Sequence, residues 1–311
     1  MKLAMYQSSG GTPRLAAVAP GSDQAHPRLI DLATAAGGDQ PALSSIQAVL
    51  EAGEAGTTAA AAALQRGLND SRAAVPAGAR LLAPLPRPAK VLALAGNYRA
   101  HRAEGGVSSP EPEQALPEVF CKPATSIIGP DEAIRLPGPP VVAVDYEGEL
   151  GVVIGKRCTR VSAAEAMQYV GGYLCLNDVS GRKLDPGFER SPELLARARF
   201  FDWLAGKWFN TFCPIGPWLV TADEVADPMA LTLLTRVNGE ERQRTSTGEM
   251  IHNIVRTIAW CSTVNTLEPG DIIATGTPAG VGSASGRFLA AGDVVEVEIE
   301  GIGILRNPVS A

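Results

Sequence analysis

The chain has 311 residues, of which 45% are hydrophobic and 19% charged, and its formal net charge is -6 at pH 7. Such a chain can bury a sizeable core, and its length favours one main domain with a smaller one. No apolar run approaches the roughly 20 residues of a membrane-spanning helix, and no basic run suits nucleic acid or an anionic membrane. The N-terminal stretch MKLAMYQSSGG reaches polar residues too soon for a signal peptide, so we expect a cytoplasmic protein.

The cysteines argue against a disulfide framework. There are five, which is an odd number, and they are widely spaced without any CxxC pair. This pattern is equally unsuited to a thiolate metal site. We therefore expect most of them to be core residues.

The first 85 residues predict a small α+β domain. Short strands are expected at 2–7, 14–19 and 28–32, and two alanine-rich helices at 42–54 and 57–69. Residues 73–90 contain four prolines, which is typical of an extended linker. We place the domain boundary near residue 85.

Short strands dominate residues 86–311. They are expected at 91–95, 118–121, 141–155, 172–177, 216–220, 231–237, 271–275 and 293–305, with helices near 98–104, 163–168, 191–205 and 247–263. Turn residues are frequent and βαβ alternation is absent. This favours a β-rich α+β domain closed into a mixed roll or barrel over a doubly wound sheet.

The segment VVAVDYEGELGVVIG, residues 141–155, places acidic residues at every second position in an otherwise apolar run. On a strand, Glu147 and Glu149 point to the same side, and Asp145 precedes them in the same alternation. The simpler interpretation is the solvent face of a half-buried strand. However, unpaired carboxylates in an apolar band are costly, and a divalent cation would neutralise them.

A third carboxylate, Asp178, stands where the apolar run GGYLCLNDVS ends. Together with Glu147 and Glu149 it would make an all-oxygen site. Such a site selects Mg²⁺ or Mn²⁺, with Ca²⁺ also possible, and disfavours zinc because His and Cys ligands are missing. Three carboxylates leave coordination positions for water or for a chelating substrate.

Three histidines occur: His26 in an expected loop, His252 in an expected helix, and His101 in GNYRAHRAEGG. His101 and Glu104 are three residues apart, so on a helical turn they share a face, and the carboxylate can orient the imidazole as a base. A surface helical pair is the alternative. For His252 we favour a structural role.

The segment TLEPGDIIATGTPAGVG, residues 266–282, fits neither common nucleotide-binding glycine motif. Its backbone N–H groups around Gly276 and the hydroxyls of Thr275 and Thr277 could receive a carboxylate, or the segment could be a structural turn. Lys122 and Lys207 are isolated cations among apolar neighbours, and each could hold an anion or simply be solvated. No GxSxG motif supports a serine nucleophile.

The motifs GNYRAH...E, FCKP, DYEGELGVVIG, YLCLNDVS, a lysine before WFNTFCPIGP, VNGE and LEPGDIIATGTPAGVG, taken in this order, resemble the fumarylacetoacetate hydrolase superfamily. The resemblance covers about residues 91–308. The first 85 residues resemble the extra N-terminal domain of longer members in position only.

The resemblance implies a mixed β-roll, usually a homodimer, with Mg²⁺ or Mn²⁺ held by Glu147, Glu149 and Asp178. It also implies a 2-oxo acid substrate and a water-activating dyad, which falls on His101 and Glu104. In that picture Lys207 polarises or protonates the substrate, the Thr277 segment receives its carboxylate, and Arg182 matches the arginine that follows the metal-binding aspartate.

The sequence departs from the family pattern after Asp178. Lys183 stands at a usually acidic position and Asp185 where a glutamine is common. Contacts made by that glutamine therefore do not transfer to this chain.

The expected reaction is hydrolysis of a carbon–carbon bond in an acylpyruvate, with pyruvate as one product. Decarboxylation of oxaloacetate, or tautomerisation of a related oxo acid, is the alternative, because neither needs an attacking water. A non-catalytic protein that keeps the metal as a structural clip is a third possibility, which His101, Glu104 and Lys207 argue against.

Overall fold

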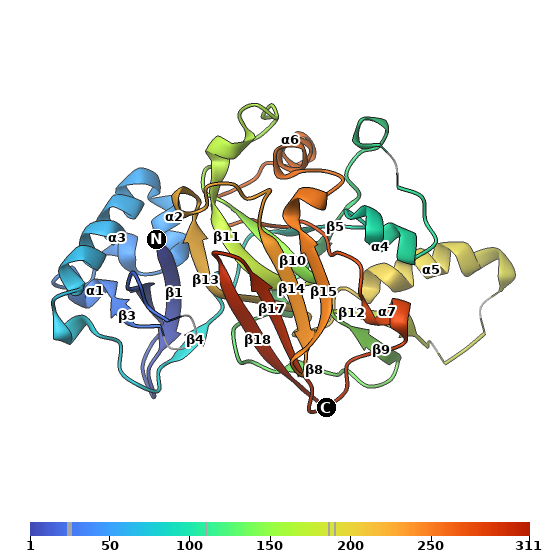
Figure 1. Cartoon of the computed structure of the whole chain (residues 1–311), viewed down its shortest axis with the longest axis horizontal. Coiled ribbons are helices and arrows are strands. Elements are labelled where there is room, and N and C mark those ends of the chain that lie inside the picture. The colour runs from blue at the N-terminus through green and yellow to red at the C-terminus, as the bar shows by residue number, and fades with distance from the viewer. Residues whose placement is uncertain (24–26, 110, 186, 190) are drawn as a thin grey trace.

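The structure is a computed structural model that describes residues 1–23, 27–109, 111–185, 187–189 and 191–311. His26 lies outside the described residues. Among these residues the chain forms sheets with helices around them (Figure 1), so the predicted β-rich α+β fold is confirmed. No helix of the described ranges has the length and apolar character needed to cross a membrane.

A mixed sheet of eleven strands, counted over the described residues, is the centre of the molecule. Its order is β3 (Leu29–Asp31), β2 (Arg14–Val18), β1 (Lys2–Gln7), β13 (Cys213–Thr221), β11 (Val170–Asn177), β10 (Gly148–Ile154), β16 (Ile272–Ala274), β5 (Val91–Leu94) and β6 (Val119–Lys122), with β4 (Arg80–Leu82) paired to β1 and β7 (Ile127–Ile128) to β13. Most neighbours are antiparallel, whereas β5 runs parallel to β16.

Two smaller sheets lie beside the main sheet. One has the order β15 (Glu240–Ser246), β14 (Thr232–Val237), β17 (Val294–Ile299), β18 (Gly303–Ser310) and β8 (Ile134–Arg135), and the other pairs β9 (Val141–Asp145) with β12 (Ser180–Leu184). The α-helices are α1 (Leu32–Ala35), α2 (Ile46–Glu51), α3 (Gly53–Gly67), α4 (Arg99–Glu104), α5 (Leu195–Ala205), α6 (Ile254–Val264) and α7 (Gly282–Ser285).

Short 3₁₀ turns connect these elements: η1 (Pro41–Leu43), η2 (Ser71–Ala73), η3 (Pro112–Gln114), η4 (Ala124–Ser126), η5 (Ala166–Tyr169), η6 (Pro192–Leu194), η7 (Ala222–Glu224) and η8 (Thr247–Glu249). Figure 1 shows α1, α2 and α3 at one end of the molecule and α4 and α5 at the other. The two ends therefore differ in which helices cover them.

The main sheet is apolar on both faces. Alternate residues of a strand face opposite sides, so Val153 and Leu174 join one buried cluster while Val152 and Tyr173 join another. The first cluster also contains Leu3 and apolar residues of α2 and α3. The N-terminal strands thus share a core with the rest of the chain, and β1 pairs with β13. A division near residue 85 stays a prediction.

Several expected elements differ from the observed ones. The strand expected at 141–155 breaks at Tyr146 and Glu147, because the Asp145 side chain accepts the Tyr146 N–H that a ladder would use. The helix expected at 247–263 begins only at Ile254, where the Asn253 side chain caps it by accepting from Arg256 N. His252 therefore precedes the helix.

The remaining differences have local causes. The strand expected at 293–305 is two strands, β17 and β18, joined by a turn in which Gly301 has a φ of 74°. The helix expected at 163–168 is the single 3₁₀ turn η5. The expected linker at 73–90 contains β4, which pairs with β1.

Candidate metal centre and substrate cavity

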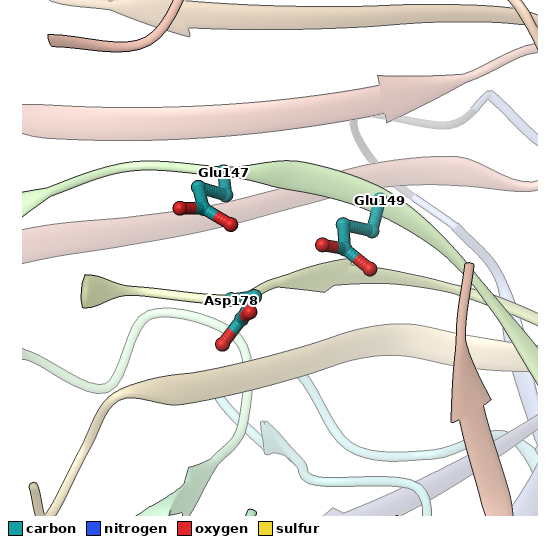
Figure 2. Close-up of side chains that lie close together, drawn as sticks. All are labelled: Glu147, Glu149 and Asp178. Atoms are coloured by element: carbon teal, nitrogen blue, oxygen red, sulfur yellow. The ribbon is translucent and has the colours of Figure 1, made fainter. Parts of the chain in front are cut away.

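Three carboxylates meet where the main sheet joins the β9–β12 sheet. Glu147 lies between β9 and β10, Glu149 is the second residue of β10, and Asp178 directly follows β11. Since Gly148 of β10 is paired with Asn177 of β11, the beginning of one strand faces the end of the other. One ligand oxygen from each of the three buried side chains lies within 4.8 Å of the others. Figure 2 shows Glu147 and Glu149 extending toward Asp178.

Backbone contacts fix this junction. Glu147 N donates to Asn177 Oδ1 at 2.9 Å, and Asp178 N donates to Glu147 O at 2.9 Å. The Ser180 hydroxyl donates to Glu147 Oε1 at 3.1 Å. The chain turns away from β10 and β11 here with its polar groups paired, so the carboxylates are held on an ordered backbone.

Lys207 bridges two of the carboxylates. Its Nζ donates to Glu147 Oε2 at 2.9 Å and to Asp178 Oδ2 at 2.6 Å. Burial opposes the charged ammonium, but Asp178 and Glu147 outweigh it and raise the pKa of Lys207. The ammonium is therefore charged at neutral pH.

Arg182, on β12, contacts a second pair of carboxylates. Its Nη2 lies 2.6 Å from Glu147 Oε1, and its Nε donates to Asp145 Oδ2 at 2.8 Å. Burial favours a neutral Glu147, yet Lys207 and Arg182 outweigh burial and lower its pKa to about 2. Asp145 also accepts from Gly282 N at the start of α7, so it positions Arg182 from outside the three-carboxylate cluster.

Glu149 is the carboxylate that these cations do not satisfy. Its Oε2 accepts from Gly276 N at 2.7 Å, whereas its Oε1 is buried and has no hydrogen-bond partner among the described residues. Burial and the charges of Asp178 and Glu147 raise the pKa of Glu149 well above its usual range. An unpaired oxygen in an acidic, oxygen-only cluster fits a hard divalent cation.

The predicted dyad lies on α4. His101 Nδ1 is 3.4 Å from Glu104 Oε2, and Glu104 Oε1 accepts from Gly280 N at 2.7 Å. His101 lines the same cavity as Glu147 and Lys207. The structure thus brings the dyad and the acidic cluster to one cavity.

The Thr275–Thr277 segment supports β10. Thr275 Oγ1 donates to Leu150 O at 2.9 Å, and Thr277 Oγ1 donates to Gly148 O at 3.0 Å. The hydroxyl protons expected to receive a carboxylate are thus donated to the backbone of β10. Thr277 lines the cavity.

Two further buried side chains form hydrogen bonds or ion pairs with residues of the site. Lys122 Nζ donates to Lys207 O at 2.6 Å and lies 2.5 Å from Asp178 Oδ1, but Lys122 is not part of the cavity lining. Gln243, on β15, accepts from Gly148 N and donates to Thr277 Oγ1. Sequence reasoning missed Gln243, since its strand carries no apolar stripe.

The cavity has a volume of about 570 Å³. Its lining comprises Leu94, Ala95, Gly96, His101, Glu118, Val119, Phe120, Glu147, Arg182, Phe200, Trp203, Lys207 and Thr277. Sequence reasoning named none of these three aromatic residues individually. It expected only that the segment 187–203, whose FFDW run in α5 holds two of them, could shape the pocket. Lys183 and Asp185, which depart from the family pattern, do not belong to this lining; Lys183 Nζ lies 5.9 Å from the Phe288 ring centre.

The sequence model of the family described as "Fumarylacetoacetate (FAA) hydrolase C-terminal" matches residues 90–310. The chain therefore belongs to the fumarylacetoacetate hydrolase superfamily, as its motif order indicated. It is 44% identical over 230 residues, 73% of this chain and 68% of the relative, to the mitochondrial oxaloacetate tautomerase FAHD2A of Bos taurus.

Two solved structures show the range of activities among similar proteins. Maleylpyruvate hydrolase from Sphingobium sp. SYK-6, in complex with manganese(II) and pyruvate, is 32% identical with a TM-score of 0.76, over 100% of this chain and 99% of that one. The 2-hydroxyhepta-2,4-diene-1,7-dioate isomerase from Mycobacterium marinum is 34% identical with a TM-score of 0.71, over 100% and 98%.

Proposed function

We propose that the protein is a divalent-metal-dependent hydrolase that cleaves a carbon–carbon bond of an acylpyruvate, a 2,4-dioxo acid. The observation that carries this proposal is the common cavity of His101, Lys207 and Glu147, with Glu149 and Asp178 beside them. The reaction adds water to the 4-carbonyl, breaks the bond between carbons 3 and 4, and yields a carboxylic acid and pyruvate.

Glu147, Glu149 and Asp178 would hold the cation, Mg²⁺ or Mn²⁺. The chemistry that it supplies when bound is Lewis-acid polarisation of the substrate's carboxylate and 2-oxo oxygens. The manganese in the Sphingobium hydrolase complex supports a divalent ion for this family.

His101 is the proposed base. The Glu104 carboxylate lies at Nδ1 and leaves Nε2 to take a proton from water. The Gly280 N–H holds Glu104 from the opposite side, so the pair keeps its position on α4.

Lys207 is the proposed stabiliser of the leaving group. Bond cleavage leaves a pyruvate enolate, and negative charge develops on its oxygen. The Lys207 ammonium lines the cavity and has a raised pKa, so it offers a positive hydrogen-bond donor rather than a base.

The test is pyruvate release from acetylpyruvate, fumarylpyruvate and oxaloacetate, each measured with Mg²⁺ and with a chelator. We expect release from at least one acylpyruvate that requires the metal. Full activity with chelator present would contradict the metal assignment, and release from neither acylpyruvate would contradict the hydrolase.

Oxaloacetate tautomerisation is the second candidate, and the 44% identity to the bovine tautomerase favours it. Tautomerisation, like decarboxylation of oxaloacetate, needs no attacking water. The conversion of enol to keto oxaloacetate, monitored by ultraviolet absorbance, tests the tautomerase function directly. His101→Ala should lower hydrolysis about 10²–10⁴-fold, the range of a removed general base, and leave decarboxylation at a reduced rate.

A homodimer and residence in the cytoplasm remain predictions. The mass in solution, measured by light scattering, tests the first. The bovine relative is named as mitochondrial, so the second requires direct localisation.

A further inference from the structure

Three aromatic side chains of the cavity lining, Phe120, Trp203 and Phe200, lie next to one another beside Lys207, and we call them the aromatic wall. Lys207 Nζ lies 5.3 Å from the Phe120 ring centre and 5.8 Å from that of Trp203. Phe120 and Trp203 meet edge to face at 5.1 Å, and Phe200 follows at 6.0 Å from Trp203. Trp203 and Phe200 come from α5 and Phe120 from β6, so the wall belongs to two elements.

Phe200 is the exposed member of the aromatic wall, since 57% of the residue is accessible to solvent. An apolar ring on a cavity lining gains from a ligand that covers it, because this removes apolar surface from water. Phe200 is therefore a contact surface for the substrate group that extends beyond Lys207.

The charges of the lining are distributed unevenly. Its two permanent cations among the described residues, Arg182 and Lys207, are already bound to Glu147 and its neighbours. The other acidic lining residue, Glu118, has an exposed side chain that lies 3.5 Å from Arg102 Nη1. Arg102 also donates to the carbonyl of Ser108, and it lies outside the lining. No described lining residue offers a free cation to a second substrate carboxylate.

We propose that this enzyme selects 2,4-dioxo acids with a neutral, flat and apolar acyl end, such as an alkenyl or aryl group, and discriminates against a second carboxylate there. The proposal rests on the hydrolase function above and names its substrate class. A flat group gains by packing against these rings, face to face with one and edge to face with another. A carboxylate in the same place loses hydration, finds no cation and faces Glu118.

A matched pair of substrates tests the charge. Crotonylpyruvate and fumarylpyruvate differ only in a terminal methyl in place of a carboxylate. We expect kcat/KM for crotonylpyruvate to be at least about tenfold higher, because one unpaired charge costs upwards of the 1.36 kcal/mol that corresponds to tenfold. Equal values, or a preference for fumarylpyruvate or oxaloacetate, would overturn the proposal.

Two variants test the residues. Phe200→Ala should lower kcat/KM for benzoylpyruvate about three- to tenfold, the usual worth of an aromatic pair, and change that for acetylpyruvate less. Phe201→Ala is the matched control, since Phe201 is its exposed neighbour and does not line the cavity. Identical effects of the two phenylalanine variants would contradict the role of the aromatic wall.

Glu118→Gln should narrow the difference in kcat/KM between crotonylpyruvate and fumarylpyruvate.

Calorimetric binding of the same acids with Mg²⁺ separates this proposal from the hydrolase function. If no acid releases pyruvate, the hydrolase function is wrong, whereas tighter binding of crotonylpyruvate than of fumarylpyruvate would still support the selectivity. Equal binding without turnover would overturn both.

Discussion

At the level of single residues, Glu149 differs from its two neighbours in the acidic cluster. Glu147 and Asp178 both contact Lys207, whereas Glu149 keeps one buried oxygen without a partner among the described residues. A buried carboxylate in this position is costly when ionised, and its raised pKa expresses that cost. The pKa of Glu149 is higher in the folded protein than in the unfolded chain. Without metal, Glu149 therefore lowers the free energy of unfolding once the pH rises above its unfolded-state pKa.

Glu149→Gln should abolish most of the thermal stabilisation by Mg²⁺ or Mn²⁺. Wild-type protein at a metal concentration 100 times Kd should gain about 2.7 kcal/mol. Without metal, the variant should be at least as stable as wild type at pH 7, because the glutamine has no carboxyl group whose ionisation burial and the neighbouring carboxylates oppose. Scanning calorimetry with metal and with chelator measures both effects.

Glu118→Gln is the control, since it makes the same chemical change on an exposed side chain of the cavity. An equal metal-induced shift in the Glu149 and Glu118 variants would show that Glu149 is not a ligand.

The parts of the site that could be predicted from the sequence are those whose residues are close together in the chain. The approach of Glu147 and Glu149 is local, because only one residue separates them, although Glu147 lies just before β10 rather than within a strand. Asp178 required only that an apolar strand end there. The contacts of Lys122 and Gln243 with the site could not be predicted, because the pairing of distant strands decides which side chains lie next to the three carboxylates.

At the level of elements, α4 is held against the 275–281 segment through one acidic side chain. Glu104 Oε1 accepts from Gly280 N while Oε2 lies at His101. The side chain thus combines two functions, since it anchors the helix and orients the imidazole. Variants that keep one function can separate them.

Glu104→Ala should release the helix, whereas Glu104→Gln keeps an oxygen that can accept from Gly280 N. We expect faster amide hydrogen exchange over residues 99–107 in the alanine variant and near wild-type exchange in the glutamine variant. Both should lose activity, the alanine variant by about 10²-fold or more, as when a base is lost.

Unchanged exchange in the alanine variant would contradict the anchoring role. Full activity in the glutamine variant would contradict the need for a carboxylate beside His101.

Two of the strands missing from the sequence prediction, β12 and β15, are polar. β15 reads EERQRTS and lies at the edge of its sheet, with Gln243 as its buried residue. β12 is short, and its two buried residues, Ser180 and Gly181, are small and not strongly apolar. Hydrophobic alternation detects strands with an apolar buried face, and neither strand has one. Gln243 comes from β15, so the same gap removed it from the expected supporting contacts, whereas Arg182 of β12 was expected at the site only through the family resemblance.

At the level of the whole molecule, the N-terminal strands belong to the sheet that carries the site. β1 pairs with β13, which pairs with β11, the strand that ends at Asp178. The first cluster of core residues spans both parts of the chain. We therefore predict one cooperative unfolding transition rather than two.

Asp31→Asn tests this coupling from the N-terminal side. Asp31 is buried and accepts from Tyr6, from Arg14 and from Thr34 N; burial opposes its charge, but these hydrogen bonds outweigh burial and lower its pKa. Its contribution to stability is present above the unfolded value of about 3.9 and is lost as the pH falls toward the lower folded value. The variant should lose about 2 kcal/mol at pH 7, and the difference from wild type should narrow at pH 3.5.

Urea unfolding, followed by tryptophan fluorescence and circular dichroism together, measures both points. The whole transition should move to lower urea without splitting. Asp70→Asn is the control and should have no measurable effect, because Asp70 forms an exposed pair with Arg72. A separate early transition in the Asp31 variant would show instead that the first 85 residues unfold alone.

The pairing of β1 with β13 also has a consequence for biosynthesis. Lys2 lies opposite Val220, so β1 is synthesised more than 200 residues before the strand with which it pairs. Until then the edge of β1 that will meet β13 is open, and an open strand edge can pair with other chains. Because such distant pairing also slows folding, the nascent N-terminal segment is where chaperone protection would matter most.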